Sequence, residues 1–250
     1  MVDTLGWRRL YGVVTPSTNT VVQPEYDDMR PAGVTNHIAR MHIPDDPITS
    51  DADFDELIRR IDGALERAVD RVVTCRPQHL ILGISAESIW GGGAAASRRI
   101  AERIRARAGD LPVTQAADAI PAALKAFGVR RRIGLLTPYF PTAEKHLQTF
   151  FSECGFEIVR AVHLACTSPV LIAHVPRERL QAALHEVDGD DIEAIVQFGA
   201  NLPMGRVAAE AEGVLGKPVI AVNTATYWHA LRSGGIGDKK PGLGRLLAEH

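Results

Sequence analysis

The chain carries the same pattern of segments twice, and this internal repeat constrains its fold most strongly. Three pairs of segments match in the same order: 11–17 with 133–139, 79–84 with 193–199, and 111–127 with 217–231. The members of each pair are about 105 to 125 residues apart, which is too long a period for a solenoid. The repeat therefore predicts two similar lobes that face each other.

Within each half, short β-rich runs alternate with amphipathic stretches. The expected strands are 10–14, 37–43, 80–84, 113, 133–136, 158–163, 194–198 and 219–222. The expected helices are 53–73, 95–108, 142–153, 177–186 and 205–215. Such alternation predicts an α/β fold with two pseudo-symmetric lobes, whose mainly parallel sheets are flanked by helices. We assign 1–118 to the first lobe, completed by 226–250, and 119–225 to the second.

Composition and charge exclude several classes of function. A net charge of −2 gives no electrostatic reason to expect nucleic acid or an anionic membrane surface as a partner. No apolar run approaches the roughly 20 residues that a membrane span needs, and the first residues lack the apolar core of a signal peptide. The three cysteines are an odd number at no metal-ligand spacing, which favours the reducing cytoplasm over a disulfide scaffold or a zinc site.

Four loops follow the matched strands, and they define the expected site. In open α/β sheets, ligands bind outside the carboxyl ends of the strands. The site is therefore expected in the cleft between the lobes, lined by residues 16–19, 83–88, 137–139 and 199–201.

The first loop reads Thr-Pro-Ser-Thr-Asn-Thr over 15–20. Pro16, Ser17 and Asn19 are candidate substrate-binding residues, because hydroxyl and amide groups can hydrogen-bond a carboxylate. The alternative is helix capping and turn formation, which use the same side chains.

The second loop starts with small residues, which let a ligand approach the backbone at Gly83 and Ile84. Ser85 can donate a hydrogen bond from its hydroxyl. Glu87 is a candidate general acid or base if burial raises its pKa, whereas the alternative is a carboxylate in the first turn of a helix.

The third and fourth loops offer donors to an oxyanion. Tyr139 presents a phenol just after a strand, where it can donate to developing negative charge or simply pack between the lobes. Gly199, Ala200 and Asn201 can expose backbone N–H groups to an oxyanion, and the glycine also suits a tight turn.

These residues resemble the aspartate/glutamate racemase superfamily, in the branch of maleate cis-trans isomerases and arylmalonate decarboxylases. Segments 16–20 and 24–25 are similar to the isomerase start, whereas the similarity to the decarboxylase lies in 83–91, 122–132, 226–230 and 241–246. The resemblance implies two pseudo-symmetric lobes, a site between them, and no metal or organic cofactor.

The catalytic cysteines of that family are missing from this chain. By motif position, the resemblance places Gly83 and Gly199 where the racemases and isomerases have their two cysteines, of which the decarboxylase keeps only the second. Cys75, Cys154 and Cys166 match neither position. The resemblance therefore implies an anion-binding site without the thiol that normally transfers the proton.

The remaining family groups carry over in part. Ser85 and Tyr139 match donors to the substrate carboxylate or enediolate, and Asn19 matches the carboxylate-binding asparagine of the isomerases. We expect a cofactor-independent lyase that acts on a small carboxylic acid through an enediolate-type intermediate, with Glu87 or a water that it holds as proton donor. A maleate-type isomerase, a hydrolase or elimination activity using a Glu87-activated water, and a non-catalytic carboxylate-binding protein are the alternatives.

Two further expectations concern size and assembly. An apolar side pocket that suits a substrate larger than maleate is predicted from Ile84, Ile89, Trp90, Tyr139 and Leu202. Apolar helix faces predict a homo-oligomer.

Overall fold

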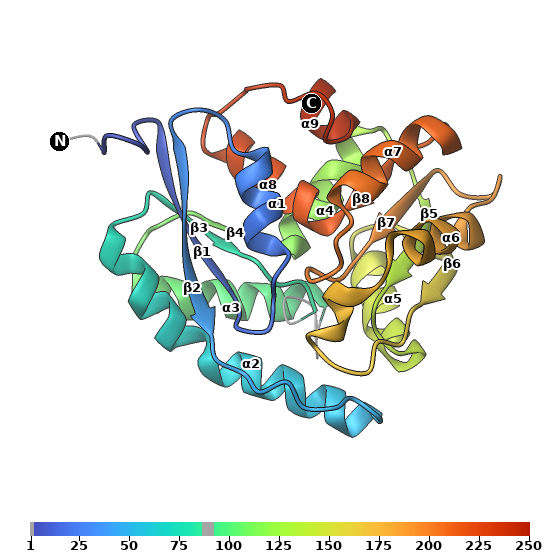
Figure 1. The fold of residues 1–250 in the computed structure, drawn as a ribbon, viewed down its shortest axis with the longest axis horizontal. Coiled ribbons are helices and arrows are strands. Elements are labelled where there is room, and N and C mark those ends of the chain that lie inside the picture. Colours follow the sequence, from blue (N-terminus) through green and yellow to red (C-terminus); the bar gives the residue numbers. More distant parts are fainter. Residues whose placement is uncertain (1–2, 87–92) are drawn as a thin grey trace.

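The fold is built on two four-stranded parallel sheets of the same topology. The computed structural model describes residues 3–86 and 93–250 (Figure 1). The first sheet has the order β2-β1-β3-β4, with β1 Arg9–Pro16, β2 Val34–Met41, β3 His79–Leu82 and β4 Val113–Thr114. The second has the order β6-β5-β7-β8, with β5 Arg132–Thr137, β6 Glu157–His163, β7 Ala194–Gln197 and β8 Val219–Ala221. The internal repeat and the predicted fold class are therefore confirmed.

Helices cover the sheets and fill the space between them. They are α1 Val22–Met29, α2 Asp51–Val72, α3 Gly93–Ala108, α4 Ala116–Ala126, α5 Glu144–Glu153, α6 Arg177–Val187, α7 Gly205–Leu215, α8 Val222–Ser233 and α9 Arg245–Glu249. Short 3₁₀ turns form η1 Val73–Cys75, η2 Pro141–Ala143 and η3 Leu171–His174. Helices α4 and α8 lie between the two sheets (Figure 1), whereas α2 and α3 cover the outer face of the first sheet and α6 and α7 that of the second.

The main apolar core joins the two halves of the molecule. Tyr11 and Ile81 of the first sheet belong to the same buried cluster as Leu135 and Val196 of the second, together with side chains of α4 and α8. Burial of this shared apolar surface stabilises the arrangement of the two sheets as well as each sheet alone.

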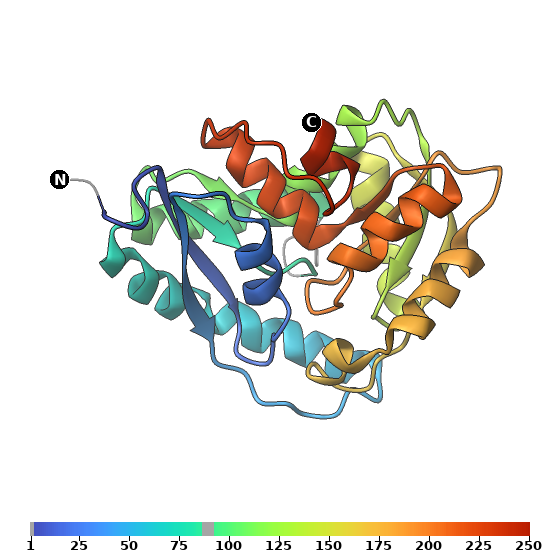
Figure 2. The same cartoon turned by 45° about the horizontal axis from the view of Figure 1, so that its top comes forward.

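Segments that are distant in the sequence also join the two halves. The C-terminal part returns to the first sheet, where the Tyr11 hydroxyl donates to the Ala230 carbonyl at 2.8 Å. The segment before α2 lies beside the segment after β6 (Figure 2), and the Ile48 N–H donates to the Thr167 carbonyl at 2.7 Å. The lobe boundaries expected from the sequence remain a prediction.

Local sequence signals explain where α2 starts. The Ser50 hydroxyl accepts from the Asp53 N–H, and the Asp53 carboxylate accepts from the Ser50 N–H, which is a capping box. Helices α1, α4, α8 and α9 were not among the helices expected from the sequence. No helix in the described part of the chain is long and apolar enough to cross a membrane.

Candidate active site

A cavity of about 60 Å³ lies where strands of both sheets end. Ten of the residues expected at the site line it: Pro16, Thr18, Asn19, Ile84, Ser85, Ala86, Tyr139, Gly199, Ala200 and Asn201. Ser17 and Gly83 are adjacent in sequence to these residues but are not among those that line the cavity. Glu87 lies outside the described residues.

Ser85 and Tyr139 form the polar centre of this cavity. Their hydroxyl oxygens are 3.1 Å apart, and both side chains are buried. Burial raises the pKa of Tyr139 to about 12, although hydrogen bonds with the Ser85 hydroxyl and the Ala86 N–H oppose that rise. The phenol therefore keeps its proton at neutral pH.

The turn after β7 joins this centre. The Ala200 N–H donates to the Ser85 hydroxyl at 3.1 Å, so this donor is engaged within the protein and is not directed at open space. Gln197, at the end of β7, stabilises the turn, since its side-chain amide donates to the Gly199 carbonyl at 2.8 Å. Residues from the two sheets thus meet through a hydrogen bond.

Asn19 has a structural role, helix capping, which the sequence analysis gave as the alternative to ligand binding. Its side-chain oxygen accepts from the N–H groups of Val21 and Val22, at 3.0 and 2.9 Å, at the start of α1. The residue is buried and also lines the cavity. The amide oxygen is therefore used in capping, and a hydrogen bond from the amide nitrogen to a ligand stays a prediction.

Ser17 and Asn201 fasten the loops around the cavity. The Ser17 hydroxyl donates to the Ile43 carbonyl at 3.1 Å and accepts from the Ile43 N–H at 3.0 Å. The Asn201 side chain accepts from the Thr20 N–H at 3.0 Å and donates to the Pro169 carbonyl at 2.8 Å. Both side chains are therefore used in positioning the loops.

The two glycines at the expected cysteine positions occupy tight backbone sites. Gly199 has a φ of 145°, and a Cβ built there would lie 2.3 Å from Cδ of Pro138. At Gly83, a Cβ would lie 2.8 Å from Cγ1 of Val22. A side chain at either position requires neighbouring atoms to move, and at Gly199 it also strains the backbone.

The three cysteines lie away from the cavity lining and form no disulfide. Burial raises the pKa of each thiol, that of Cys166 to about 11. A thiol with such a pKa is almost entirely protonated at neutral pH and is a poor nucleophile.

Part of the cavity lining is apolar, and much of this apolar wall comes from α2. Phe54, Leu57, Ile58 and Ile61 of this helix line the cavity, and Ile43 and Ile172 extend the same surface. These side chains could not be predicted as site residues from the sequence, because their spacing of three and four residues is also that of a helix face packed on a sheet. The spacing was visible, but nothing in it separated a cavity wall from the core.

The side pocket expected from the sequence is only partly present. Ile84 and Tyr139 line the cavity, but Leu202 packs in the outer core of the second sheet, so its prediction is wrong. Leu202 follows a tight turn that directs its side chain to the opposite face of that sheet. Ile89 and Trp90 lie outside the described residues.

Residues 3–86 and 93–250 contain no group of three or more His, Cys, Asp or Glu side chains placed to hold a metal ion. The polar groups of the cavity are hydroxyls, amides and backbone N–H groups. Groups of these types can donate hydrogen bonds to an anion and stabilise negative charge that develops on a bound acid.

The fold and cavity define an α/β protein of two similar lobes, with a candidate site where strands of both parallel sheets end. A model of the arylmalonate decarboxylase family matches residues 46–247. The chain belongs to this family. Its relatives include a decarboxylase and isomerases, so the family is one of enzymes.

Individual relatives extend over nearly the whole chain. A maleate isomerase from Nocardia farcinica is 28% identical over 254 residues, which cover 98% of this chain and 97% of that protein. The arylmalonate decarboxylase of Bordetella bronchiseptica is 29% identical over 196 residues, covering 75% and 80%.

Solved structures share the fold. A Nocardia farcinica maleate cis-trans isomerase mutant with a covalently bound succinylcysteine intermediate has a TM-score of 0.85 at 24% identity, covering 97% of this chain and 99% of that one. A structure of arylmalonate decarboxylase has a TM-score of 0.71 at 22% identity, covering 95% and 98%.

Proposed function

We propose that this protein is a cofactor-independent lyase that removes one carboxylate from a small malonate-type acid through an enediolate-type intermediate. The observation that carries this proposal is that the cavity lining combines hydrogen-bond donors with an apolar wall. The donors are the hydroxyls of Ser85 and Tyr139, and the apolar wall consists largely of side chains of α2. A dicarboxylic acid bound between them has one carboxylate against hydrogen-bond donors and the other against hydrocarbon.

The apolar wall favours loss of the carboxylate that faces it. Burial against hydrocarbon removes water from that charge, whereas the products are a neutral CO₂ and an enediolate whose charge lies on the other side. The bond between the α-carbon and the leaving carboxylate breaks, and its electron pair moves into the remaining carboxylate. Donors at that carboxylate stabilise the resulting dianion.

Tyr139 is suited to be the donor at that point. Because its pKa is raised to about 12 by burial, its proton remains on the phenol. With the Ser85 hydroxyl donating to the Tyr139 oxygen, the phenol proton is directed at the enediolate. Tyr139→Phe then removes one charge-stabilising donor and is expected to lower kcat by about a hundredfold.

A proton must return to the α-carbon after CO₂ leaves. Glu87, or a water that it holds, remains the hypothesised donor. A glutamic acid has a lower intrinsic pKa than a thiol, roughly 4.3 against 8.5, so burial has to keep it protonated. Glu87→Gln is expected to abolish turnover and to preserve ligand binding, and full activity in that variant contradicts the assignment.

Proton NMR of purified protein with a panel of acids tests the proposal. The volume of about 60 Å³ is far below the ~300 Å³ of a pocket for a drug-sized ligand, so small substituents are favoured. In D₂O, methylmalonate or ethylmalonate is expected to give the monoacid with deuterium at the α-carbon. Phenylmalonate tests the size limit. Absence of decarboxylation across the panel contradicts the proposal.

A maleate-type cis-trans isomerase is the second candidate, favoured by the 28% identity to a maleate isomerase over nearly the whole chain. A related isomerase carries a succinylcysteine intermediate, but this chain has glycine at both positions where the resemblance places the catalytic cysteines. The same NMR panel includes maleate, and formation of fumarate without decarboxylation supports this second candidate.

A further inference from the structure

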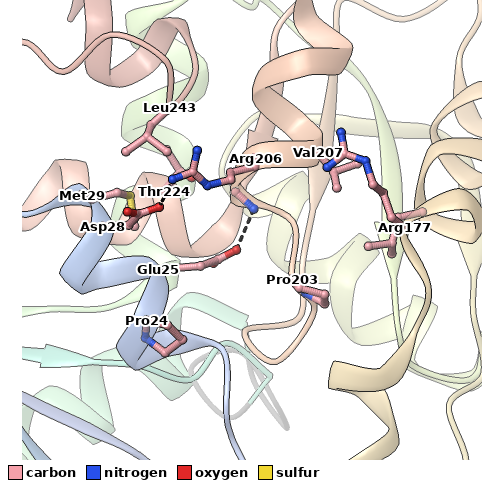
Figure 3. Close-up of a pocket in the computed structure, with 12 residues that line it drawn as sticks. Pro24, Glu25, Asp28, Met29, Arg177, Pro203, Arg206, Val207, Thr224 and Leu243 are labelled. Atoms are coloured by element: carbon pink, nitrogen blue, oxygen red, sulfur yellow. Dashed lines mark hydrogen bonds and ion pairs between the residues drawn. The ribbon is translucent and has the colours of Figure 1, made fainter.

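A hydrogen-bonded path outside the cavity leads from α1 to the polar centre of the site. It starts at Glu25, whose carboxylate accepts from the Gly205 N–H and from the Asn223 side-chain amide, each at 2.7 Å. Figure 3 shows the Glu25 side chain directed at the chain segment that starts α7. One carboxylate of α1 is therefore bonded to both α7 and α8.

Asn223 continues this path toward the cavity. Its amide nitrogen also donates to the Ala200 carbonyl at 3.0 Å, and the side chain is buried. Since the Ala200 N–H donates to Ser85 and Ser85 bonds to Tyr139, the path reaches both hydroxyls of the candidate site.

We propose that Glu25 is a positioning residue, which orients the Asn223 amide and so holds the turn 199–201 where Ala200 meets Ser85. The two oxygens of one carboxyl group each accept from a different N–H donor here, so Glu25 satisfies Gly205 and Asn223 together. The expected effect on kcat rests on the proposed function, whereas the expected effect on the turn 199–201 does not.

Glu25 acts through other residues, because it lines a different cavity. That cavity is about 390 Å³ and lies between α1, α6 and α7 (Figure 3). Asp28 and Arg206 pair with each other there, one helical turn from Glu25. Asp28 therefore offers a matched control, since it shares the helix and the cavity but has no bond to the path.

Amide hydrogen exchange at Ala200 tests the structural part. Glu25→Gln keeps the size of the side chain but replaces one acceptor oxygen with a donor, so one of the two bonds must break. We expect exchange at Ala200 to rise about tenfold or more in this variant and to stay unchanged in Asp28→Asn. Asn223→Ala removes the amide that donates to the Ala200 carbonyl, so it should raise exchange at Ala200 in the same way and replaces Glu25→Gln if that variant does not fold. In the double variant the two increases in exchange should not add, because both substitutions break the same path.

Steady-state kinetics on the acid that turns over fastest test the catalytic consequence. We expect Glu25→Gln to lower kcat about ten- to a hundredfold, with KM changed by less than about threefold, because the turn is misplaced while the substrate still binds. Unchanged exchange at Ala200 overturns the inference. Raised exchange without turnover of any acid by the unmodified protein supports the positioning role and contradicts the proposed function.

Discussion

At the scale of single residues, Asn19 combines a structural and a proposed binding role. Its amide oxygen caps α1 and its side chain also lines the cavity. Oxygen and nitrogen of one amide can serve these two purposes separately, because capping requires only an acceptor.

The substitution Asn19→Asp separates the two roles. Aspartate keeps the capping oxygen, so the free energy of unfolding should stay within about 1 kcal/mol of the unmodified protein. It removes the amide donors and adds a negative charge, so calorimetry should find malonate affinity at least about tenfold weaker. Undiminished malonate affinity contradicts a ligand role for Asn19.

The sequence predicts which residues at strand ends lie near the cavity, but it does not reveal the partners that each side chain binds. Ser85 and Tyr139 could be predicted because matched strands place the residues that follow them at one edge. Asn201 has a side chain of the right chemistry, yet backbone groups of two other segments, 18–20 and 169, bind it. Contacts between segments so distant in the chain leave no trace in local sequence.

At the scale of elements, α2 contributes both to the core and to the cavity. Its C-terminal half packs on the first sheet, whereas Phe54, Leu57, Ile58 and Ile61 line the cavity. Long elements such as α2 could be predicted from their apolar spacing. Helix α1 could not, because its eight residues contain little periodicity and depend on the Asn19 cap.

The proposed role of α2 predicts that polarity in its wall slows decarboxylation. Ile58→Thr and Ile58→Val give side chains of nearly equal shape, but only threonine adds a hydroxyl that can hydrogen-bond the leaving carboxylate. We expect kcat to fall about tenfold in Ile58→Thr relative to Ile58→Val. Equal kcat values in the two variants would show that the apolar wall does not assist the reaction.

At the scale of the whole molecule, the shared strand order of the two sheets follows from the sequence repeat. The contacts that join the two halves, such as the hydrogen bond between Ile48 and Thr167, do not follow from it.

The stability of the molecule also depends on buried polar groups. His79 is 1% exposed, and its Nε2 lies 2.8 Å from the Thr114 hydroxyl.

Acid should weaken the fold through His79. Burial lowers the pKa of this imidazole from 6.5 to about 4, so between these values the unfolded chain binds more protons than the folded one. The stabilisation is complete above pH 6.5 and decreases as pH falls toward 4, by about 2 kcal/mol between pH 7 and 5.

Urea unfolding of the unmodified protein and of His79→Gln at both pH values measures that contribution. The difference between pH 7 and 5 should be smaller in His79→Gln by about 2 kcal/mol. Glu25 titrates in the same range with the opposite sign, because burial raises its pKa to about 7. Comparing the two proteins cancels its effect, and equal pH dependence contradicts the role of His79.

We propose that this member of the arylmalonate decarboxylase family returns a proton to the α-carbon without a thiol. The direct measurement is CO₂ release from the best malonate by the unmodified protein and by a variant with Cys75→Ser, Cys154→Ser and Cys166→Ser. The two rates are expected to lie within about twofold of each other, a difference of only about 0.4 kcal/mol in activation free energy. Loss of CO₂ release in the folded cysteine-free variant would contradict it.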